Sequence, residues 1–284
     1  MEIRKIGVLG LGIMGHGIAQ VAAQSGFLVS AYDINEEAIQ KGLDSIRSGL
    51  DRQIKKGKIS ESEAKAIMSK IVPSVDLIET VKSAEVIIEA IPEVLEIKKE
   101  TFRKIDGALK SESIIATNTS QFSITELASV TTRADRFIGM HWFNPPQVMR
   151  LVELVCGLET SDSTVETILA LCRQFGKETI VCLKDTPGFI TTRMLNAFLA
   201  EAYRVVEEGI ATAEDVDKAA KLAFNHPMGP LELADFSGLD TALRTAMALE
   251  AVYGDRYKPT HTIRNLVSAG HLGRKTKRGW HHYD

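Results

Sequence analysis

The fold is decided by the stretch Lys5-Ile6-Gly7-Val8-Leu9-Gly10-Leu11-Gly12-Ile13-Met14-Gly15. It reads as a buried strand that runs into a G-x-G-x-x-G turn, and apolar residues then recur at helical spacing from Ile18 to Ala22. In such a turn the first glycine allows the sharp bend, the second lets a pyrophosphate approach the backbone, and the third lets helix and strand pack closely. We therefore predict a dinucleotide site, whose contacts are Gly10, Gly12, Ile13, Met14 and Gly15.

The second predicted strand ends in a carboxylate. Residues 27–32 are mostly apolar, and Asp33 follows them, about 20 residues beyond the glycines. An acid at this spacing is placed to bind the ribose hydroxyls of NAD. Neither Ile34 nor Asn35 could neutralise a 2′-phosphate, so NAD is favoured over NADP. The alternative is a glycine loop followed by an ordinary turn aspartate.

The totals describe an ordinary globular chain of 284 residues, 44% apolar and 25% charged. A net charge of -3 gives no broad attraction to nucleic acid or anionic lipid. The three cysteines form no C-x-x-C pair, which fits a reducing compartment, and no run approaches the roughly 18 apolar residues that cross a bilayer. We expect a cytoplasmic protein without membrane or nucleic-acid partners. No metal is expected, because His281 and His282 lack a third ligand.

Strands and helices alternate up to about residue 184, and only helical spacing follows. This order predicts a Rossmann-type, doubly wound, mostly parallel sheet that binds NAD in residues 1–184, and an all-helical domain in residues 185–284. Further strands are expected at 85–90, 113–116, 136–140, 149–156 and 179–183, and the later helices at 189–208, 213–224, 238–253 and 259–268.

A histidine and a glutamate are predicted to face each other across two strands. Pro145 and Pro146 break the chain after His141, and a reversal near Gln147 brings Glu153 roughly opposite His141. A carboxylate on one imidazole nitrogen fixes the tautomer and leaves the other nitrogen to move a proton. The alternative is a surface histidine beside a strand glutamate.

Other polar groups follow the predicted strands or helices. Ligands bind beyond the carboxyl ends of strands in open α/β sheets, which makes Glu93 and Lys98 possible cofactor contacts, although each could be an ordinary helix-start charge. Residues 117–120, Thr-Asn-Thr-Ser, could donate hydrogen bonds to a ligand or serve as turn and cap residues. The basic residues at 55–58 could complement a helix dipole or bind the phosphates of an extended substrate.

Taken together, the motifs resemble one family along essentially the whole chain. In order they are Gly10-Leu11-Gly12-Ile13-Met14-Gly15, Thr117-Asn118-Thr119-Ser120, His141-Trp142-Phe143-Asn144-Pro145, Val148-Met149-Arg150-Leu151-Val152-Glu153, Thr186-Pro187-Gly188-Phe189-Ile190 and Asn225-His226-Pro227-Met228-Gly229-Pro230-Leu231-Glu232-Leu233. As an ordered set they are similar to the short, single-function L-3-hydroxyacyl-CoA dehydrogenases, especially the bacterial 3-hydroxybutyryl-CoA type.

The resemblance implies NAD-dependent interconversion of 3-hydroxyacyl-CoA and 3-ketoacyl-CoA. It implies His141 as the general base and Glu153 as its orienting partner. Ser120 and Asn144 would help to hold substrate and nicotinamide, Glu93 and Lys98 match the family's cofactor contacts, and Lys55 and Lys56 become contacts for the CoA phosphates. The helical domain would close over the cleft and form a homodimer.

One position departs from the family pattern. The family usually carries an asparagine before an arginine after the Pro-Gly-Phe-Ile motif, whereas this chain has Thr192 before Arg193. The hydroxyl of Thr192 can still donate one hydrogen bond to the 3-oxygen of the substrate, but it is shorter than an amide. Two other functions stay open. One is a related dehydrogenase of a free hydroxy acid that uses the same histidine–glutamate pair, although the basic residues at 55–58 favour CoA. The other is a non-catalytic, crystallin-like cofactor-binding protein, which Thr192 favours and the presence of His141, Glu153 and Ser120 opposes.

Overall fold

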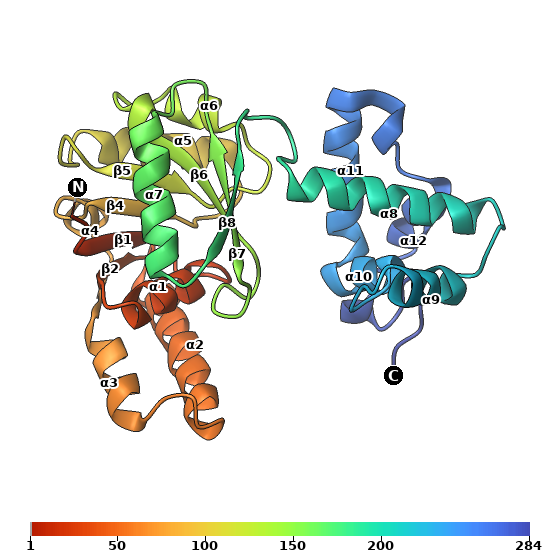
Figure 1. Cartoon of the computed structure of the whole chain (residues 1–284), viewed down its shortest axis with the longest axis horizontal. Coiled ribbons are helices and arrows are strands. Elements are labelled where there is room, and N and C mark those ends of the chain that lie inside the picture. The colour runs from red at the N-terminus through yellow and green to blue at the C-terminus, as the bar shows by residue number, and fades with distance from the viewer. Residues whose placement is uncertain (1) are drawn as a thin grey trace. The chain divides into compact units, whose positions relative to one another are not determined.

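The computed structural model describes residues 2–284, and its internal contacts divide the chain into two units, Met1–Thr186 and Pro187–Asp284 (Figure 1). The first unit contains one eight-stranded sheet with helices on its faces, and the second is built from helices. The predicted fold class, a doubly wound and mostly parallel sheet followed by a helical region, is confirmed. Within residues 2–284, no helix combines the length and the apolar composition needed to cross a membrane.

The strand order of the sheet is β3-β2-β1-β4-β5-β6-β7-β8. The strands are β1 Lys5–Leu9, β2 Leu28–Tyr32, β3 Ile71–Ser74, β4 Val86–Glu89, β5 Ile114–Thr117, β6 Phe137–Trp142, β7 Leu151–Cys156 and β8 Glu178–Cys182. Strands β1 to β6 run parallel, β7 is antiparallel to β6, and β8 is parallel to β7. The edge where β1 to β6 end and β7 and β8 begin is called the carboxyl edge below, and the opposite one the amino edge.

Helices connect the strands and cover both faces of the sheet. They are α1 Gly15–Gln24, α2 Glu36–Lys55, α3 Glu61–Ser69, α4 Leu77–Val81, α5 Leu95–Asp106, α6 Ile124–Ala128 and α7 Asp162–Gln174, with a 3₁₀ turn at Ala134–Arg136. Asn35 caps α2, and Ser60 with Glu63 forms a capping box on α3.

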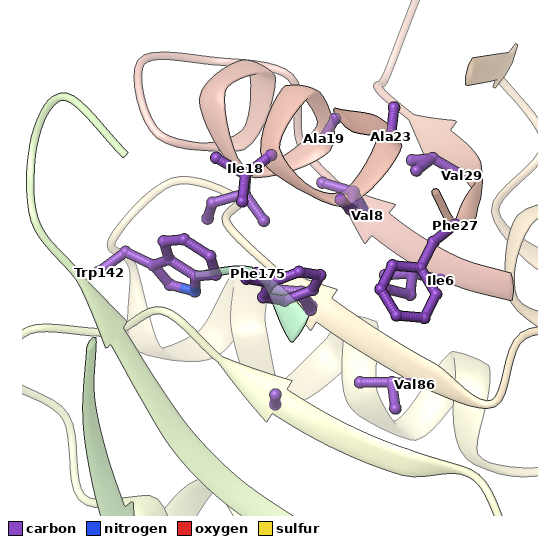
Figure 2. Packing of buried hydrophobic residues seen from close by; sticks show 14 of the residues in the cluster. Ile6, Val8, Ile18, Ala19, Ala23, Phe27, Val29, Val86, Trp142 and Phe175 are labelled. Carbon is purple, nitrogen blue, oxygen red and sulfur yellow. The ribbon is translucent and has the colours of Figure 1, made fainter. Parts of the chain in front are cut away.

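The main core lies between one face of the sheet and the helices α1, α2 and α7. Figure 2 shows Val8 of β1 under α1, Ile6 of the same strand beside Phe27, and Trp142 next to the ring of Phe175. The β-strand period of two places every second side chain on this face. Each large apolar side chain buried here contributes about 1.5–3 kcal/mol.

The side chains that alternate with this core point to the opposite sheet face, where α5 and α6 lie. Near the carboxyl edge they are polar: Glu89 in β4, Thr117 in β5, His141 in β6 and Glu153 in β7. All four are buried. Buried ionisable groups gathered on one face, at one edge, are the usual mark of a functional site.

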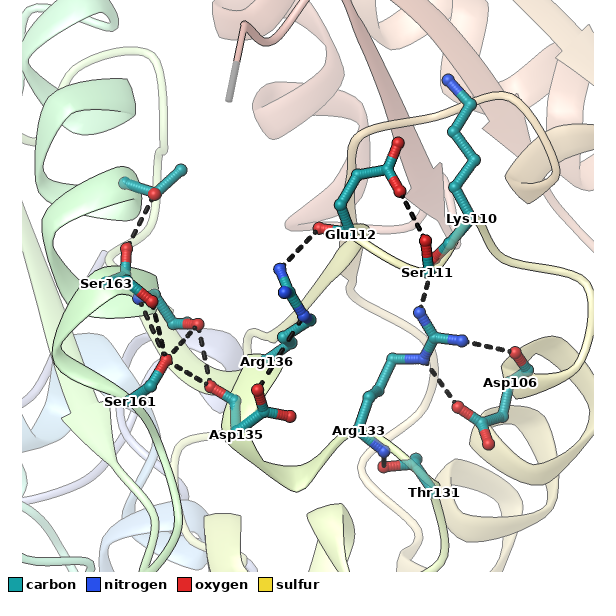
Figure 3. A network of polar contacts seen from close by, with 12 residues as sticks. Asp106, Lys110, Ser111, Glu112, Thr131, Arg133, Asp135, Arg136, Ser161 and Ser163 are labelled. Carbon is teal, nitrogen blue, oxygen red and sulfur yellow. Dashed lines mark hydrogen bonds and ion pairs between the residues drawn. The ribbon is translucent and has the colours of Figure 1, made fainter.

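The amino edge carries an ionic network of its own. The Glu85 carboxylate accepts hydrogen bonds from the backbone N–H groups of Arg4 and Lys5 and from the amine of Lys110. Arg133 forms an ion pair with Asp106 at 2.8 Å (Figure 3). These groups tie the starts of neighbouring strands together, away from the carboxyl edge.

The second unit forms a separate helical core. Its helices are α8 Thr191–Glu207, α9 Ala213–Ala223, α10 Pro230–Ser237, α11 Leu239–Tyr253 and α12 His261–Ser268, with 3₁₀ turns at Gly254–Tyr257 and Arg274–Thr276. Four of the five helices were predicted. The fifth, α10, has eight residues, begins with Pro230 and was not predicted. His281, near the end of the chain, pairs with the buried Asp217 at 2.6 Å.

Candidate active site

The glycine turn has the geometry that its sequence predicts. Gly10 has a φ of +89°, and a Cβ there would lie 2.7 Å from the carbonyl oxygen of Ala90. A Cβ on Gly15 would lie 1.7 Å from the carbonyl oxygen of Gly10, so the helix could not approach the turn. By contrast, a Cβ on Gly12 would meet nothing within 4 Å. This open side of the turn is where a pyrophosphate can approach the backbone.

The groups around the turn fit NAD. The first turn of α1 contains no acidic residue, and no side chain caps it, so no side chain neutralises its N–H groups and positive dipole end. Asp33 accepts hydrogen bonds from the backbone N–H groups of Leu11, at 2.8 Å, and Ile34, at 2.7 Å. Its carboxylate therefore stands beside the glycine turn, as the sequence-based interpretation requires.

The predicted contact between His141 and Glu153 is confirmed. The two residues are direct partners in the antiparallel pairing of β6 with β7, and His141 Nδ1 lies 2.9 Å from Glu153 Oε2. Asn118 accepts a hydrogen bond from the backbone N–H of Trp142 at 2.9 Å, which fixes the end of β6 next to the histidine. A buried carboxylate on Nδ1 holds the proton there and directs Nε2 to proton transfer.

The polar segment after β5 has mixed roles. Thr117 donates to Glu89 and Thr119 donates to Glu93, each at 2.5 Å, while Asn118 braces β6. Ser120 is exposed, and within residues 2–284 its hydroxyl has no hydrogen-bond partner. Of the four residues left open between ligand contact and turn, Ser120 has the most exposed side chain, and the side-chain N–H groups of the partly exposed Asn118 are also available to a ligand.

Lys98, predicted as a cofactor contact, is 1% exposed. Its amine is buried between two carboxylates, 2.5 Å from Glu89 Oε1 and 3.1 Å from Glu93 Oε2. Glu93 is partly exposed, and its Oε1 also accepts a hydrogen bond from the backbone N–H of Ser120 at 3.0 Å. Glu93 thus connects Lys98 to Ser120.

Glu89 is the buried acid that sequence reasoning missed. Burial raises its pKa, and the charge and hydrogen bond of Lys98 oppose that rise. The available signal was an acid as the last residue of an otherwise apolar strand, Val86–Glu89. Its position makes it the common partner of Lys98 and Thr117.

The two lysines predicted to bind CoA phosphates face different hollows. Lys56 lines a hollow of about 530 Å³ with Arg52 and Lys58, next to Gln147 from the loop between β6 and β7. Lys55 lines a separate groove of about 650 Å³ between α2 and α3. Only the hollow of Lys56 includes residues of the loop that carries Asn144, an exposed residue.

Thr192 belongs to the second unit. It lies in the first turn of α8, and its carbonyl oxygen accepts a hydrogen bond from the side-chain amide of Asn196 at 2.8 Å. The residues before it are in strained or turning backbone, with Gly188 at a φ of +79° and Phe189 at +49°. The sharp turn at 188–190 sets where α8 starts.

Comparison with known proteins gives the same assignment along the whole chain. Residues 5–186 match the NAD binding domain of 3-hydroxyacyl-CoA dehydrogenase, and residues 188–283 match its C-terminal domain. The probable 3-hydroxybutyryl-CoA dehydrogenase of Bacillus subtilis is 45% identical over 285 residues, which cover 100% of this chain and 99% of that protein.

Two solved structures extend the comparison. The (S)-3-hydroxybutyryl-CoA dehydrogenase PaaH1 of Ralstonia eutropha has a TM-score of 0.96 and 45% identity, with 100% of both chains covered. The NAD+-dependent dismutase 5-formyl-3-hydroxy-2-methylpyridine 4-carboxylic acid 5-dehydrogenase has a TM-score of 0.80 and 32% identity, over 100% of this chain and 92% of that one.

Proposed function

The chain belongs to the 3-hydroxyacyl-CoA dehydrogenase family, and we propose that it interconverts short-chain (S)-3-hydroxyacyl-CoA and 3-ketoacyl-CoA with NAD, acting on 3-hydroxybutyryl-CoA. The observation that carries this proposal is the buried pair of His141 and Glu153 at the same sheet edge as the glycine turn. A proton-transfer group and a dinucleotide site at one edge are what oxidation of a hydroxyl requires.

His141 acts as the general base in oxidation and as the general acid in reduction. In oxidation its Nε2 takes the proton of the 3-hydroxyl while C3 is oxidised, and in reduction the imidazolium returns that proton to the 3-oxygen. Glu153 keeps the other proton on Nδ1 and stabilises the imidazolium. Positioned proton transfer of this kind contributes about 10²–10⁴ in rate. When bound, NAD supplies the two-electron acceptor.

The remaining residues bind and orient. We assign the pyrophosphate to the backbone of the glycine turn and the ribose to Asp33, both supported by the open side of Gly12 and by the position of the Asp33 carboxylate. Ser120 and Asn144 hold substrate and nicotinamide. Glu93 faces the cofactor, and Lys98 acts through it.

Lys55 and Lys56 are proposed to bind the CoA phosphates, and the two hollows give a way to separate them. Because only the hollow of Lys56 includes the β6–β7 loop, we expect Lys56→Ala to raise the KM for acetoacetyl-CoA more than Lys55→Ala does. The rise in KM of each variant should become smaller as salt is added, since screening weakens phosphate contacts in the native chain as well. A larger effect of Lys55→Ala would place the phosphates in the α2–α3 groove.

Thr192 stands where the family carries asparagine, and we propose that its hydroxyl donates one hydrogen bond to the substrate's 3-oxygen. Thr192→Asn should keep or raise kcat, because an amide reaches further. A complete loss of activity with intact NADH binding would contradict this placement.

We further propose that the enzyme is a cytoplasmic homodimer joined through the second unit. Large apolar side chains are exposed there, including Leu222, Phe224 and Phe236, as expected of a surface that is covered in an assembly. All three cysteines are free thiols, in keeping with a reducing compartment. Light scattering on Phe224→Glu beside the native chain tests the interface: dissociation supports it, and an unchanged mass argues against it.

The function is tested by NADH oxidation with acetoacetyl-CoA and with free acetoacetate, for the native chain and for His141→Ala. We expect turnover of the CoA ester alone, abolished in the variant, and much weaker turnover with NADPH. Equal turnover of free acetoacetate would support a dehydrogenase of free acids, a reading favoured by the 32% identity to the pyridine carboxylic acid enzyme. Turnover of neither substrate, with NADH still bound, would indicate a non-catalytic protein.

A further inference from the structure

Lys177 is a buried lysine at the carboxyl edge that the assignments above do not use. It lies between α7 and β8 and is 9% exposed. Its amine donates hydrogen bonds to the carbonyl oxygens of Pro146, at 2.6 Å, and Met149, at 2.7 Å. Burial lowers the pKa of this amine, and no carboxylate among residues 2–284 opposes that shift. The charge is therefore held in place by carbonyl dipoles and not by an ion pair.

The same amine contacts the end of β6. It lies over the Trp142 ring, 5.6 Å from the centroid, and the ring packs against Phe175 with 5.7 Å between centroids (Figure 2). Trp142 directly follows His141 in the chain. Lys177 therefore contacts both the residue after the histidine and the loop that follows.

That loop, residues 143–150, carries Asn144, and its last residue is tied to β8: the carbonyl oxygen of Arg150 accepts a hydrogen bond from the backbone N–H of Glu178 at 2.9 Å, and the exposed Arg150 side chain lies 3.2 Å from the Glu178 carboxylate. Two of its N–H groups, those of Val148 and Met149, donate to the carbonyl oxygen of Pro145, which closes the turn on itself. The side chain of Gln147 reaches Gln20 at 3.4 Å, a long hydrogen bond. The two short bonds from Lys177 are thus the strongest side-chain anchors of the loop.

We propose that Lys177 is a positioning residue, which sets the place of Asn144 relative to the His141–Glu153 pair by holding the backbone at 146 and 149. The proposal rests on the function proposed above. Removing the amine leaves two carbonyl oxygens without donors and frees the loop to sample other conformations. Misplacing a substrate-holding group by about 1 Å can cost up to about 10²-fold in rate.

Lys177→Met is the direct test, because methionine fills similar space without a donor. We expect kcat with acetoacetyl-CoA to fall about 10–10²-fold and the NADH Kd to change much less, since Asn144 is one of several assigned cofactor contacts and the glycine turn is untouched. Lys177→Gln, which keeps N–H donors, should recover part of the loss. It also keeps the test decisive if the methionine variant does not fold.

Arg133→Met is the matched control. The Arg133 guanidinium also holds two carbonyl oxygens, those of Lys110 at 2.6 Å and Asp106 at 2.9 Å, but at the amino edge (Figure 3). It should lower the melting temperature and leave kcat within about twofold at temperatures where the chain is folded. An equal loss of kcat in this control, or an unchanged kcat in Lys177→Met, would overturn the proposal.

Hydrogen exchange tests the anchoring role of Lys177 independently of the enzymatic activity. If the native chain does not reduce acetoacetyl-CoA, the proposed function fails, but the loop can still be examined. Lys177→Met should speed amide exchange at Val148 and Met149 without speeding it at the glycine turn. Unchanged exchange at these two amides would overturn the anchoring role.

Discussion

Glu85 and Glu89 stand at the two ends of β4, and each pairs with a lysine. At the amino edge, the Glu85 side chain is 15% exposed and pairs with Lys110 at 2.7 Å. At the carboxyl edge, Glu89 is 0% exposed and pairs with Lys98 at 2.5 Å. A glutamate–lysine ion pair is therefore found at both ends of β4, partly exposed at the amino edge and buried at the carboxyl edge.

The pKa values of the two carboxyl groups are shifted in opposite directions. Burial raises the pKa of Glu85, but hydrogen bonds from Lys110 and from two backbone N–H groups outweigh it, and the net shift is downward. Burial dominates at Glu89, and the net shift is upward in spite of Lys98. The charged form of Glu85 thus adds stability at neutral pH that is lost on acidification, whereas ionising Glu89 opposes folding as the pH rises.

This difference indicates which edge the fold uses for stability and which it keeps for chemistry. The amino edge lowers its carboxyl pKa values with local donors, as an edge selected for stability would. The carboxyl edge keeps Glu89, Lys98, His141 and Glu153 buried, where single charges are costly. Buried ionisable groups of this kind cluster at functional sites, which agrees with the function proposed above.

The largest expected effect on stability is at Lys98. Lys98→Met leaves Glu89 buried without its cation and should lower the free energy of unfolding by about 3–5 kcal/mol, whereas adding Glu89→Gln should restore most of it. Urea unfolding of the two single variants and the double variant measures this coupling. A loss below about 1 kcal/mol in Lys98→Met would mean that leaving Glu89 buried without its cation costs little.

An intermediate effect is expected at Asp106 on the amino edge. Burial raises its pKa, but hydrogen bonds from Arg133 and Thr132 outweigh this and lower it. Asp106→Asn should therefore cost about 1–3 kcal/mol near neutral pH. The difference from the native chain should shrink below about pH 4, as the native carboxyl is itself protonated. A pH-independent difference would show that packing, not charge, is lost.

The smallest effect is expected at a pair that belongs to neither edge. Glu37 and Lys41 lie four residues apart on α2 and are 77% and 76% exposed. Glu37→Gln should change the free energy of unfolding by about 0.3–0.5 kcal/mol. A loss as large as that of Asp106→Asn would show that burial does not determine how much each ion pair contributes to the free energy of unfolding.

The sequence was sufficient to predict most of the sheet and the central contact of the site. Hydrophobic runs gave seven of the eight strands, and the paired prolines predicted the reversal that sets His141 opposite Glu153. Strand β3 was missed, because it is four residues long and contains Pro73. Such a strand is confined to a sheet edge, where β3 lies.

Tertiary partners could not be predicted in the same way. Periodicity shows that a side chain points inward, but it does not show which charge meets it there. For this reason the sequence did not predict that the amine of Lys98 pairs with Glu89 and Glu93, and its contact with the cofactor stays a prediction. Lys177 was not noticed at all, since its acceptors are backbone carbonyls, which leave no signal in the sequence.

The most direct test of the contrast between the edges is one measurement on Glu153→Gln and Glu85→Gln: kcat for acetoacetyl-CoA reduction together with the free energy of unfolding. Glu153→Gln should lower kcat by about 10²–10⁴-fold with NADH affinity retained, whereas Glu85→Gln should cost about 1–2 kcal/mol of stability and leave kcat within about twofold. Equal losses of kcat, or a fully active Glu153→Gln, would contradict the assignment of catalysis to the carboxyl edge.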